Sequence, residues 1–346
     1  MKKYIHIGFP KNFSTSLQRD YFSKHPDIFH LGIGVDNNLG YRDSIVEKTL
    51  EVYLKTCKYY KYKEVEKTII EHFQSLFKKH ERGAKVIGVS GEHLGFAFSY
   101  DGLSGKEKAE RLVQIFGSDT KIVMIIRNQF SLLKSLYREC VRVGFASNFS
   151  DFIKLLYKYQ DRNFVYDFRY DYVVETYTQL FGKENVGVFF FEDYRNEKNE
   201  LILQDGRIKL FSDLNRFLGI SETKMDFGHY NEAIPSNKIM TKAVLNAEYP
   251  HDLGNHLLES AEKHRIKKYL EEDLSFFEEE KETFSDVIIK TELIERAVSS
   301  DKTNKLVYDT NPKWISFFKE FYEEGNHKVA ALLDQKLPEE YFNLNF

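Results

Sequence analysis

The sequence predicts an α/β protein in which a central parallel sheet is flanked by helices and is followed by a mainly helical C-terminal part. Two observations lead to this prediction. Five short apolar segments alternate with amphipathic helical patterns before about residue 206, and four of the five are nearly unbroken in apolar character. Strands buried on both faces have this character, and strands that alternate with helices along a chain form parallel sheets.

The expected strands are Tyr4–Phe9, Ile28–Ile33, Lys85–Ser90, Lys121–Ile126 and Val186–Phe191. The helix expected at Glu64–Lys79 has apolar residues with a period close to 3.6, and Ser150–Tyr159 and Tyr170–Phe181 behave similarly. Further along, the segments that read as helices are Lys209–Leu218, Asn255–Glu280 and Lys313–Leu333. Because no linker or repeat is evident, we expect one domain over residues 1–346, with an α/β core in 1–205 and a helical part in 206–346.

The composition narrows the functional classes. The 346 residues include 50 Lys and Arg and 53 Asp and Glu, a net charge of −3, so no overall basic field would recruit nucleic acid. No apolar run approaches the ~18 residues that span a bilayer, and the N-terminal apolar stretch is too short for a signal peptide. The two cysteines, Cys57 and Cys140, have no metal-ligand spacing. We therefore expect a cytoplasmic protein without an integral membrane segment, a nucleic-acid partner or a metal; its oligomeric state is not predicted.

The segment KYIHIGFPKNFSTSLQRDYF, residues 3–22, has the pattern of an anion site. Its apolar strand leads into Pro10 and Lys11, then into a hydroxyl-bearing turn and a helical pattern that starts near Leu17. A strand that opens onto a helix N-terminus presents backbone N–H groups and the positive end of the helix dipole to an anion. The geometry resembles a P-loop, but Lys11 precedes the turn instead of ending a glycine-rich loop, so the Walker A order is absent.

A second segment, KIVMIIRNQFSLLKSLYRE at residues 121–139, repeats this strand-to-helix logic. Its strand ends at Arg127, whose guanidinium can bind a phosphate in bidentate fashion above the sheet edge. Ser135 follows two helical turns later and can offer a hydroxyl to the same group. Taken alone, Arg127 could equally be a surface ion-pair partner.

Together the two segments resemble the sulfotransferase family, whose sulfuryl donor is 3′-phosphoadenosine 5′-phosphosulfate (PAPS). The family's first motif reads roughly P-K-[ST]-G-T-T-x-L, and the matching residues here are Pro10, Lys11, Ser14, Thr15, Ser16 and Leu17. The second motif, R-x7-S-x-Y, is matched by Arg127, Ser135 and Tyr137. The family's acidic-apolar element and its helix ending in L-G are matched by VGVFFFEDY (186–194) and LNRFLGI (214–220), so the resemblance covers residues 3–220.

The resemblance implies that Lys11 and the turn Asn12–Ser16 hold the 5′-phosphosulfate and that Arg127 and Ser135 hold the 3′-phosphate. The cofactor-binding set is therefore Lys11, Asn12, Phe13, Ser14, Thr15, Ser16, Arg127 and Ser135, and the product is 3′,5′-ADP. Phe13 stands where the family has glycine, so the loop lacks its freest backbone position. The alternatives for Phe13 are that it covers the adenine, shapes the acceptor side, packs in the core or weakens donor binding.

Sulfuryl transfer to a hydroxyl also needs a general base, and the best candidate follows the strand Lys85–Ser90. Glu92 and His93 both stand at its carboxyl end, at the same sheet edge as Lys11 and Arg127. Their context resembles bacterial family members that use the glutamate, with His93 as a second base or an acceptor-positioning residue. The alternatives are a helix-capping or ion-paired Glu92 and a hydrogen-bonded loop histidine at His93.

The function expected from these residues is a PAPS-dependent sulfotransferase that uses no metal and acts on a hydroxyl of a carbohydrate, a lipid or a secondary metabolite. Lys11 would act on the leaving-group side of the reaction. Two rivals remain: an NTP-dependent kinase or ATPase on a P-loop-like sheet, and a nucleotide-binding module that has lost turnover.

Overall fold

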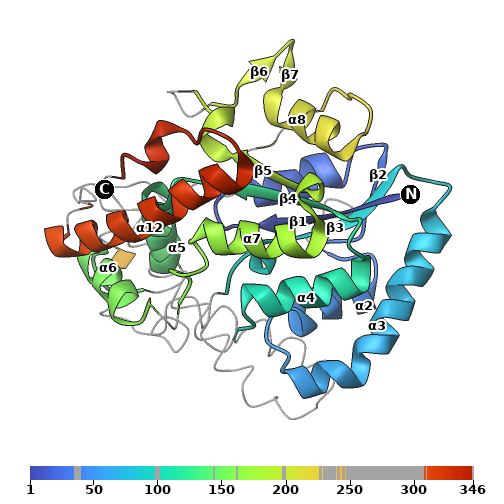
Figure 1. Ribbon diagram of the computed structural model, residues 1–346, viewed down its shortest axis with the longest axis horizontal. Coiled ribbons are helices and arrows are strands. Elements are labelled where there is room, and N and C mark those ends of the chain that lie inside the picture. The colour runs from blue at the N-terminus through green and yellow to red at the C-terminus, as the bar shows by residue number, and fades with distance from the viewer. Residues whose placement is uncertain are drawn as a thin grey trace.

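The computed structural model describes residues 1–34, 40–97, 102–142, 145–160, 163–196, 200–225 and 310–344, together with residues 228, 239, 242, 243, 246 and 308. Its centre is a five-stranded sheet in the order β2-β3-β1-β4-β5 (Figure 1). The strands are β1 (Lys2–Gly8), β2 (Ile28–His30), β3 (Val86–Gly91), β4 (Lys121–Ile126) and β5 (Val186–Phe190). All neighbouring strands run parallel, which confirms the predicted fold class.

Helices cover both faces of this sheet. The α-helices are α1 (Ser14–Ser16), α2 (Ser44–Lys48), α3 (Tyr59–His80), α4 (Gly105–Phe116), α5 (Gln129–Arg142), α6 (Phe149–Lys158), α7 (Tyr170–Phe181), α8 (Lys209–Leu218) and α12 (Pro312–Leu333). Shorter helical turns are the π-helical η1 (Leu17–Phe22) and η2 (Thr49–Tyr53) and the 3₁₀ turns η3 (Glu92–Leu94), η5 (Lys183–Asn185), η6 (Phe191–Tyr194) and η8 (Glu339–Tyr341).

Alternation along β1 divides the core into two layers. Ile5 and Ile7 face one core, which also contains the buried side chains of α3 to α7 and α12. Tyr4 faces the other core, where η1 and α8 pack. Successive side chains of a strand point to opposite faces, so an apolar strand such as β1 is covered on both sides. The result is a three-layer α/β/α arrangement (Figure 1).

The register places the carboxyl ends of three strands side by side. Ile7 of β1 is aligned with Gly91 of β3, and Gly8 of β1 is aligned with Ile125 of β4. The loops that follow β1, β3 and β4 therefore emerge next to one another. This edge is where open parallel sheets bind ligands.

Most expected elements lie where the sequence indicates, with some differences. β2 ends at His30 instead of Ile33, and the first helix begins at Ser14 instead of near Leu17. A two-stranded hairpin, β6 (Leu203–Gln204) and β7 (Arg207–Ile208), was not expected. It turns through Asp205 and Gly206, which both have positive φ, the conformation of the tight hairpin turns that Asp-Gly favours.

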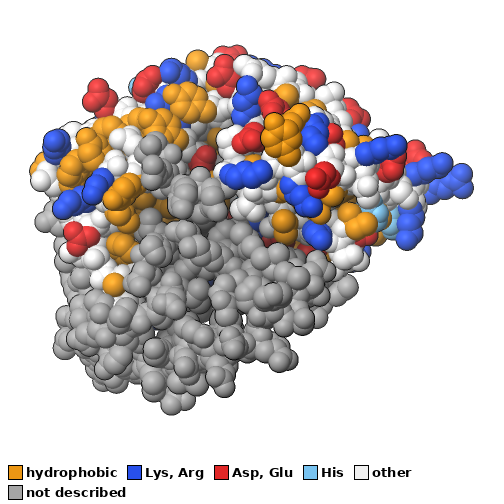
Figure 2. All heavy atoms as spheres, turned by 90° about the horizontal axis from the view of Figure 1, so that it is seen from below, with side chains coloured by type: hydrophobic (Ala, Val, Ile, Leu, Met, Phe, Trp, Pro, Cys, Tyr) orange, Lys and Arg blue, Asp and Glu red, His pale blue; other side chains and the backbone are white. Residues whose placement is uncertain are grey.

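The C-terminal part is helical where it is described. α8 has the expected bounds, and α12 begins at Pro312, one residue before the expected start. The helix expected at 255–280 lies outside the described residues. Within the described ranges, no helix is long and apolar enough to cross a membrane. On the described part of the face in Figure 2, Lys and Arg side chains are intermingled with Asp and Glu.

Candidate functional site

The candidate site consists of residues that immediately follow the sheet strands. Lys11 lies in the loop after β1, Glu92 begins η3 directly after β3, and Arg127 follows β4. Phe191 follows β5 in the same way. Parallel pairing brings these residues to one edge although they are far apart in the sequence.

The loop after β1 folds tightly back into a helix. Lys11 and Phe13 both adopt left-handed backbone conformations, with φ of 62° and 65°. The Leu17 N–H then donates to the Phe13 carbonyl at 2.9 Å and starts the helix. Phe13 is the N-cap residue, and its side chain makes no cap hydrogen bond to the first-turn N–H groups. These N–H groups are the donors that an anion at a helix N-terminus would use.

Three polar side chains of this loop bind protein carbonyls. Asn12 is buried and donates to the Ile125 carbonyl of β4 at 2.9 Å. The Ser14 hydroxyl donates to the Phe9 carbonyl at 3.3 Å, and the Ser16 hydroxyl donates to the Gly228 carbonyl at 3.1 Å. These bonds brace the loop, while Thr15 is partly exposed. Direct donation from Asn12, Ser14, Thr15 or Ser16 to a ligand stays a prediction.

Lys11 is paired with a residue that the sequence analysis did not single out. Its Nζ lies 3.4 Å from Oε2 of Glu139 on α5, and Arg142 binds the other oxygen of the same carboxylate. Burial acts to raise the pKa of Glu139, but Arg142 and then Lys11 outweigh it, so the pKa is lowered. Glu139 stands four residues after Ser135, hence on the same face of α5, and this spacing was the available signal.

Arg127 connects the two predicted motifs. Its Nη1 donates to the Lys11 carbonyl at 3.3 Å, and its own carbonyl accepts a hydrogen bond from the Tyr170 hydroxyl at 2.8 Å. Its Nε is buried without a hydrogen-bond partner among the described residues. Burial lowers the pKa of Arg127, while the nearby Glu192 opposes that shift. Ser135 lies two turns into α5 and is partly exposed.

Aromatic rings and guanidinium groups stack beside the loop. The Phe13 ring is stacked on Phe191, with centroids 4.4 Å apart and an interplanar angle of 24°. The Arg127 guanidinium lies 4.5 Å from the Phe191 ring centre, and the Arg195 guanidinium lies 4.9 Å from that of Phe13. Phe13 is only 8% exposed, so among the alternatives for this residue the structure shows packing.

Arg195 is a further residue that the sequence analysis missed. It comes two residues after the acidic pair Glu192 and Asp193 of the segment VGVFFFEDY (186–194), and this proximity was the only signal in the sequence. Burial and the charge of Arg127 both lower the pKa of Arg195. Two guanidinium groups are thus held close together beside the loop that carries Lys11.

Glu92 lies directly against the carboxyl end of β1, where the loop that carries Lys11 begins. A Cβ placed on Gly8 would approach the Glu92 Cα to 3.0 Å and the Ser14 hydroxyl oxygen to 2.9 Å. Gly8 is therefore required by the close approach of two turns, and that approach brings Glu92 beside the loop of Lys11. Glu92 is partly exposed, as a group that accepts a proton from a ligand must be.

His93 has a different environment. Its ring is 7% exposed, and Nε2 donates to the Leu50 carbonyl in η2 at 2.9 Å. Burial acts to raise the pKa of the neighbouring Glu51, but His93 and Lys55 lower it to about 2. His93 is thus a hydrogen-bonded histidine, which is one of the two alternatives that the sequence left open. Its role as a second base stays a prediction. Within the described ranges, no three His, Cys, Asp or Glu side chains are grouped to hold a metal ion.

The chain was compared with protein families, with curated proteins and with solved structures. No family model matches the chain, and no curated protein matches it. The chain is similar to a crystal structure of a sulfotransferase from Alicyclobacillus acidocaldarius, with 16% sequence identity, 97% of each chain covered and a TM-score of 0.49. At this level the likeness bears neither on the fold nor on donor, acceptor or catalytic residues.

Proposed function

We propose that this protein is a PAPS-dependent sulfotransferase that transfers a sulfuryl group to a hydroxyl of a carbohydrate, a lipid or a secondary metabolite. The observation that carries the proposal is the hydrogen bond from Arg127 Nη1 to the Lys11 carbonyl, at 3.3 Å. It joins the motif expected to bind the 5′-phosphosulfate to the motif expected to bind the 3′-phosphate. A nucleotide with anionic groups at both positions suits such a pair of adjacent cationic sites.

The residues present fit this donor. Arg127 has a buried Nε without a hydrogen-bond partner in the described part of the chain, which an anionic oxygen could accept from. The first-turn N–H groups after Phe13 and the Lys11 ammonium would hold the 5′ end, and Arg127 with Ser135 would hold the 3′-phosphate. When bound, the donor supplies an activated sulfuryl group on its 5′-phosphate.

The side chains then have separate chemical roles. Glu92 would accept the proton that the acceptor hydroxyl loses as its oxygen attacks sulfur. Lys11 and the helix N-terminus would stabilise the negative charge that develops on the leaving phosphate oxygen. The close approach of Glu92 to the loop after β1 supports this division, because base and leaving-group stabiliser must flank the transferred group.

Calorimetry and transfer assays test the proposal. We expect 3′,5′-ADP to bind the wild-type protein, and Lys11→Met and Arg127→Met each to weaken binding by about 1.5–3 kcal/mol, the value of a charge-assisted hydrogen bond. Transfer is measured as 3′,5′-ADP formed from PAPS with a panel that includes p-nitrophenol, a monosaccharide and a long-chain alcohol. Glu92→Gln should bind 3′,5′-ADP like wild type yet lose about 10²–10⁴-fold in turnover.

Two results would change the assignment. Absence of 3′,5′-ADP binding by the wild-type protein would refute the donor. Wild-type turnover in Glu92→Gln would exclude Glu92 as the base and leave His93 as the candidate.

One observation favours a second candidate, an NTP-dependent kinase or ATPase. Glu92 provides a carboxylate directly after β3, next to the end of β1 and the loop that follows it. Kinases and ATPases need an acidic residue in such a position, near the metal-bound nucleotide. The position of Lys11 ahead of the turn argues against this reading. Thermal stabilisation by ATP with Mg²⁺ but not by 3′,5′-ADP would favour it.

We also propose a reducing, cytoplasmic location. Cys57 and Cys140 are both buried as free thiols. Such thiols are typical of proteins kept reduced.

A further inference from the structure

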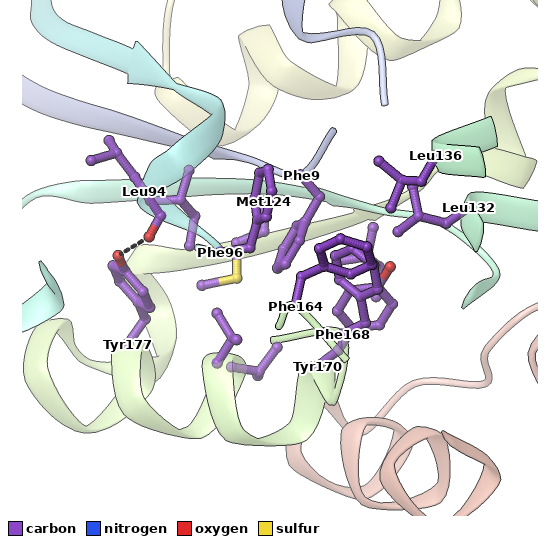
Figure 3. Packing of buried hydrophobic residues seen from close by; sticks show 14 of the residues in the cluster. Phe9, Leu94, Phe96, Met124, Leu132, Leu136, Phe164, Phe168, Tyr170 and Tyr177 are labelled. Atoms are coloured by element: carbon purple, nitrogen blue, oxygen red, sulfur yellow. Dashed lines mark hydrogen bonds between the residues drawn. The ribbon is translucent and has the colours of Figure 1, made fainter. Parts of the chain in front are cut away.

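The turn that carries Glu92 is held by buried polar side chains from two helices behind it. Lys108 of α4 is 1% exposed, and its Nζ donates to the His93 carbonyl at 2.6 Å and to the Phe96 carbonyl at 2.8 Å. The Tyr177 hydroxyl of α7 donates to the Leu94 carbonyl at 3.4 Å, as the dashed line in Figure 3 shows. Three backbone carbonyls that follow Glu92 are thus bound by side chains.

The far end of the same turn is anchored as well. Asp167, just before α7, accepts a hydrogen bond from the Ala97 N–H at 2.8 Å. Burial raises the pKa of Asp167, while the charge of Lys108 and this N–H act to lower it. Phe96 packs at this point against Phe168 within the apolar cluster drawn in Figure 3.

This arrangement is costly if stability is its only purpose. An ammonium group that is taken out of water loses hydration free energy, whereas burial of an apolar side chain of similar size is favourable; the hydrogen bonds of Lys108 and the nearby Asp167 offset part of this loss. Here two hydrogen bonds of Lys108 lead to carbonyls of the turn, those of His93 and Phe96. The buried ammonium group therefore contributes to the backbone geometry of this turn.

We propose that Lys108 is a positioning residue that holds Glu92 against the loop after β1. Glu92 begins the turn, its carbonyl accepts the Gly95 N–H at 3.4 Å, and the next carbonyl is already held by Lys108. Because the backbone directly after Glu92 is fixed, the direction of the Glu92 Cα–Cβ bond is fixed as well. The inference rests on the proposed function, in which Glu92 is the general base.

Arg111 provides a matched control on the same helix. It is also a buried cation, 5% exposed, and it donates to the Tyr53 carbonyl at 2.5 Å while its guanidinium lies 4.2 Å from the Tyr62 ring centre. Its contacts anchor the end of η2 and α3 instead of the turn. Arg111→Met therefore removes a buried charge of the same kind from the same helix without removing a bond to the Glu92 turn.

The first measurement needs no turnover. Amide hydrogen exchange of residues 92–97 is compared in wild type, Lys108→Met, Lys108→Arg and Arg111→Met. We expect Lys108→Met to accelerate exchange in this segment by about tenfold or more, because local opening becomes easier. Arg111→Met should leave the exchange of this segment near the wild-type rate.

The second measurement separates positioning from general stability. With the panel acceptor that gives the fastest wild-type turnover, Lys108→Met should lower kcat by about 100-fold, the effect of a small misplacement of a catalytic group. The Kd for 3′,5′-ADP should stay within about twofold, and Lys108→Arg should recover part of kcat. If Lys108→Met fails to fold, Tyr177→Phe removes only the Leu94 bond and should lower kcat several-fold at an unchanged Kd.

The outcomes discriminate between the two levels of inference. If wild type turns over and Lys108→Met matches Arg111→Met in both exchange and kcat, the positioning role is refuted and the proposed function stands. If wild type forms no 3′,5′-ADP with any acceptor, the proposed function fails. In that case, faster exchange in Lys108→Met would show that Lys108 only anchors the turn, and the positioning role would be refuted as well.

Discussion

Phe13 has a backbone conformation that destabilises the protein and a buried ring that stabilises it. Replacement by glycine or by alanine separates these two effects. Its backbone has φ of 65°, a left-handed conformation that disfavours any residue with a Cβ, while its ring is buried and stacked on Phe191. Both replacements remove the ring. Only glycine also removes the Cβ that makes this backbone conformation unfavourable.

The expected magnitudes follow from these features. Loss of a buried phenylalanine ring costs about 3–5 kcal/mol, and this cost is common to both variants. A left-handed residue with a Cβ costs about 1–2 kcal/mol, which alanine retains and glycine avoids. Glycine in turn loses about 0.5–1 kcal/mol more chain entropy on folding. Phe13→Gly should therefore be more stable than Phe13→Ala, by up to about 1.5 kcal/mol.

Leu17 is the matched control four residues later. It is fully buried and has ordinary helical angles, φ −62° and ψ −42°. There the order should reverse, with Leu17→Gly about 1 kcal/mol less stable than Leu17→Ala. Free energies of unfolding from urea titrations at 25 °C decide the question. A Phe13→Ala variant more stable than Phe13→Gly would show that the loop is not held in a left-handed conformation at this residue.

Two further predictions concern charge. Glu139 pairs with Lys11, so its carboxylate competes with an anion that binds there. Glu139→Gln should therefore tighten 3′,5′-ADP binding up to about fivefold, which lies within the ~1 kcal/mol of a partly exposed ion pair. An affinity measured by calorimetry that is unchanged or weaker would contradict this competition. Burial lowers the pKa of His6 to about 3 and that of His30 to about 4, so between these values and about 6.5 the unfolded chain binds more protons than the folded one. The free energy of unfolding should therefore be highest above about pH 6.5 and should fall at lower pH, by up to about 1.4 kcal/mol per pH unit for each histidine. Urea titrations at several pH values measure this slope, and His6→Gln should flatten it; identical slopes would argue against a neutral buried His6.

The elements that could be predicted are those whose signal is continuous and local. The bounds of Lys121–Ile126, Tyr170–Phe181 and Lys209–Leu218 agree with the structure because an unbroken apolar run or a regular period marks each end. α4 was not predicted, although Ser104 and Glu107 form a capping box at its start. The strands β6 and β7 have two residues each, too few for alternation to be visible.

The candidate site divides in the same way. Lys11 and Arg127 could be found because each follows its own strand within a few residues, and the motif spacing carries the signal. Glu139, Arg195 and Lys108 could not be assigned to the site, because their relevance depends on neighbours from other elements. Lys11 and Glu139, for example, are separated by 128 positions along the chain and meet only through the pairing of β1 with β4.

Local pattern in the amino-acid sequence was enough to predict the alternating strands and helices, a turn after the first strand with the pattern of an anion site, and the arginine at the end of the fourth strand. Backbone hydrogen bonds and side-chain periodicity act over a few residues, so these features can be read without knowing what packs where. The strand order, the left-handed Phe13 beneath the Arg195 guanidinium and the buried Lys108 behind Glu92 emerged from the folded arrangement. Each of them depends on which distant segments share a core, and that choice is made by the packing of the whole chain.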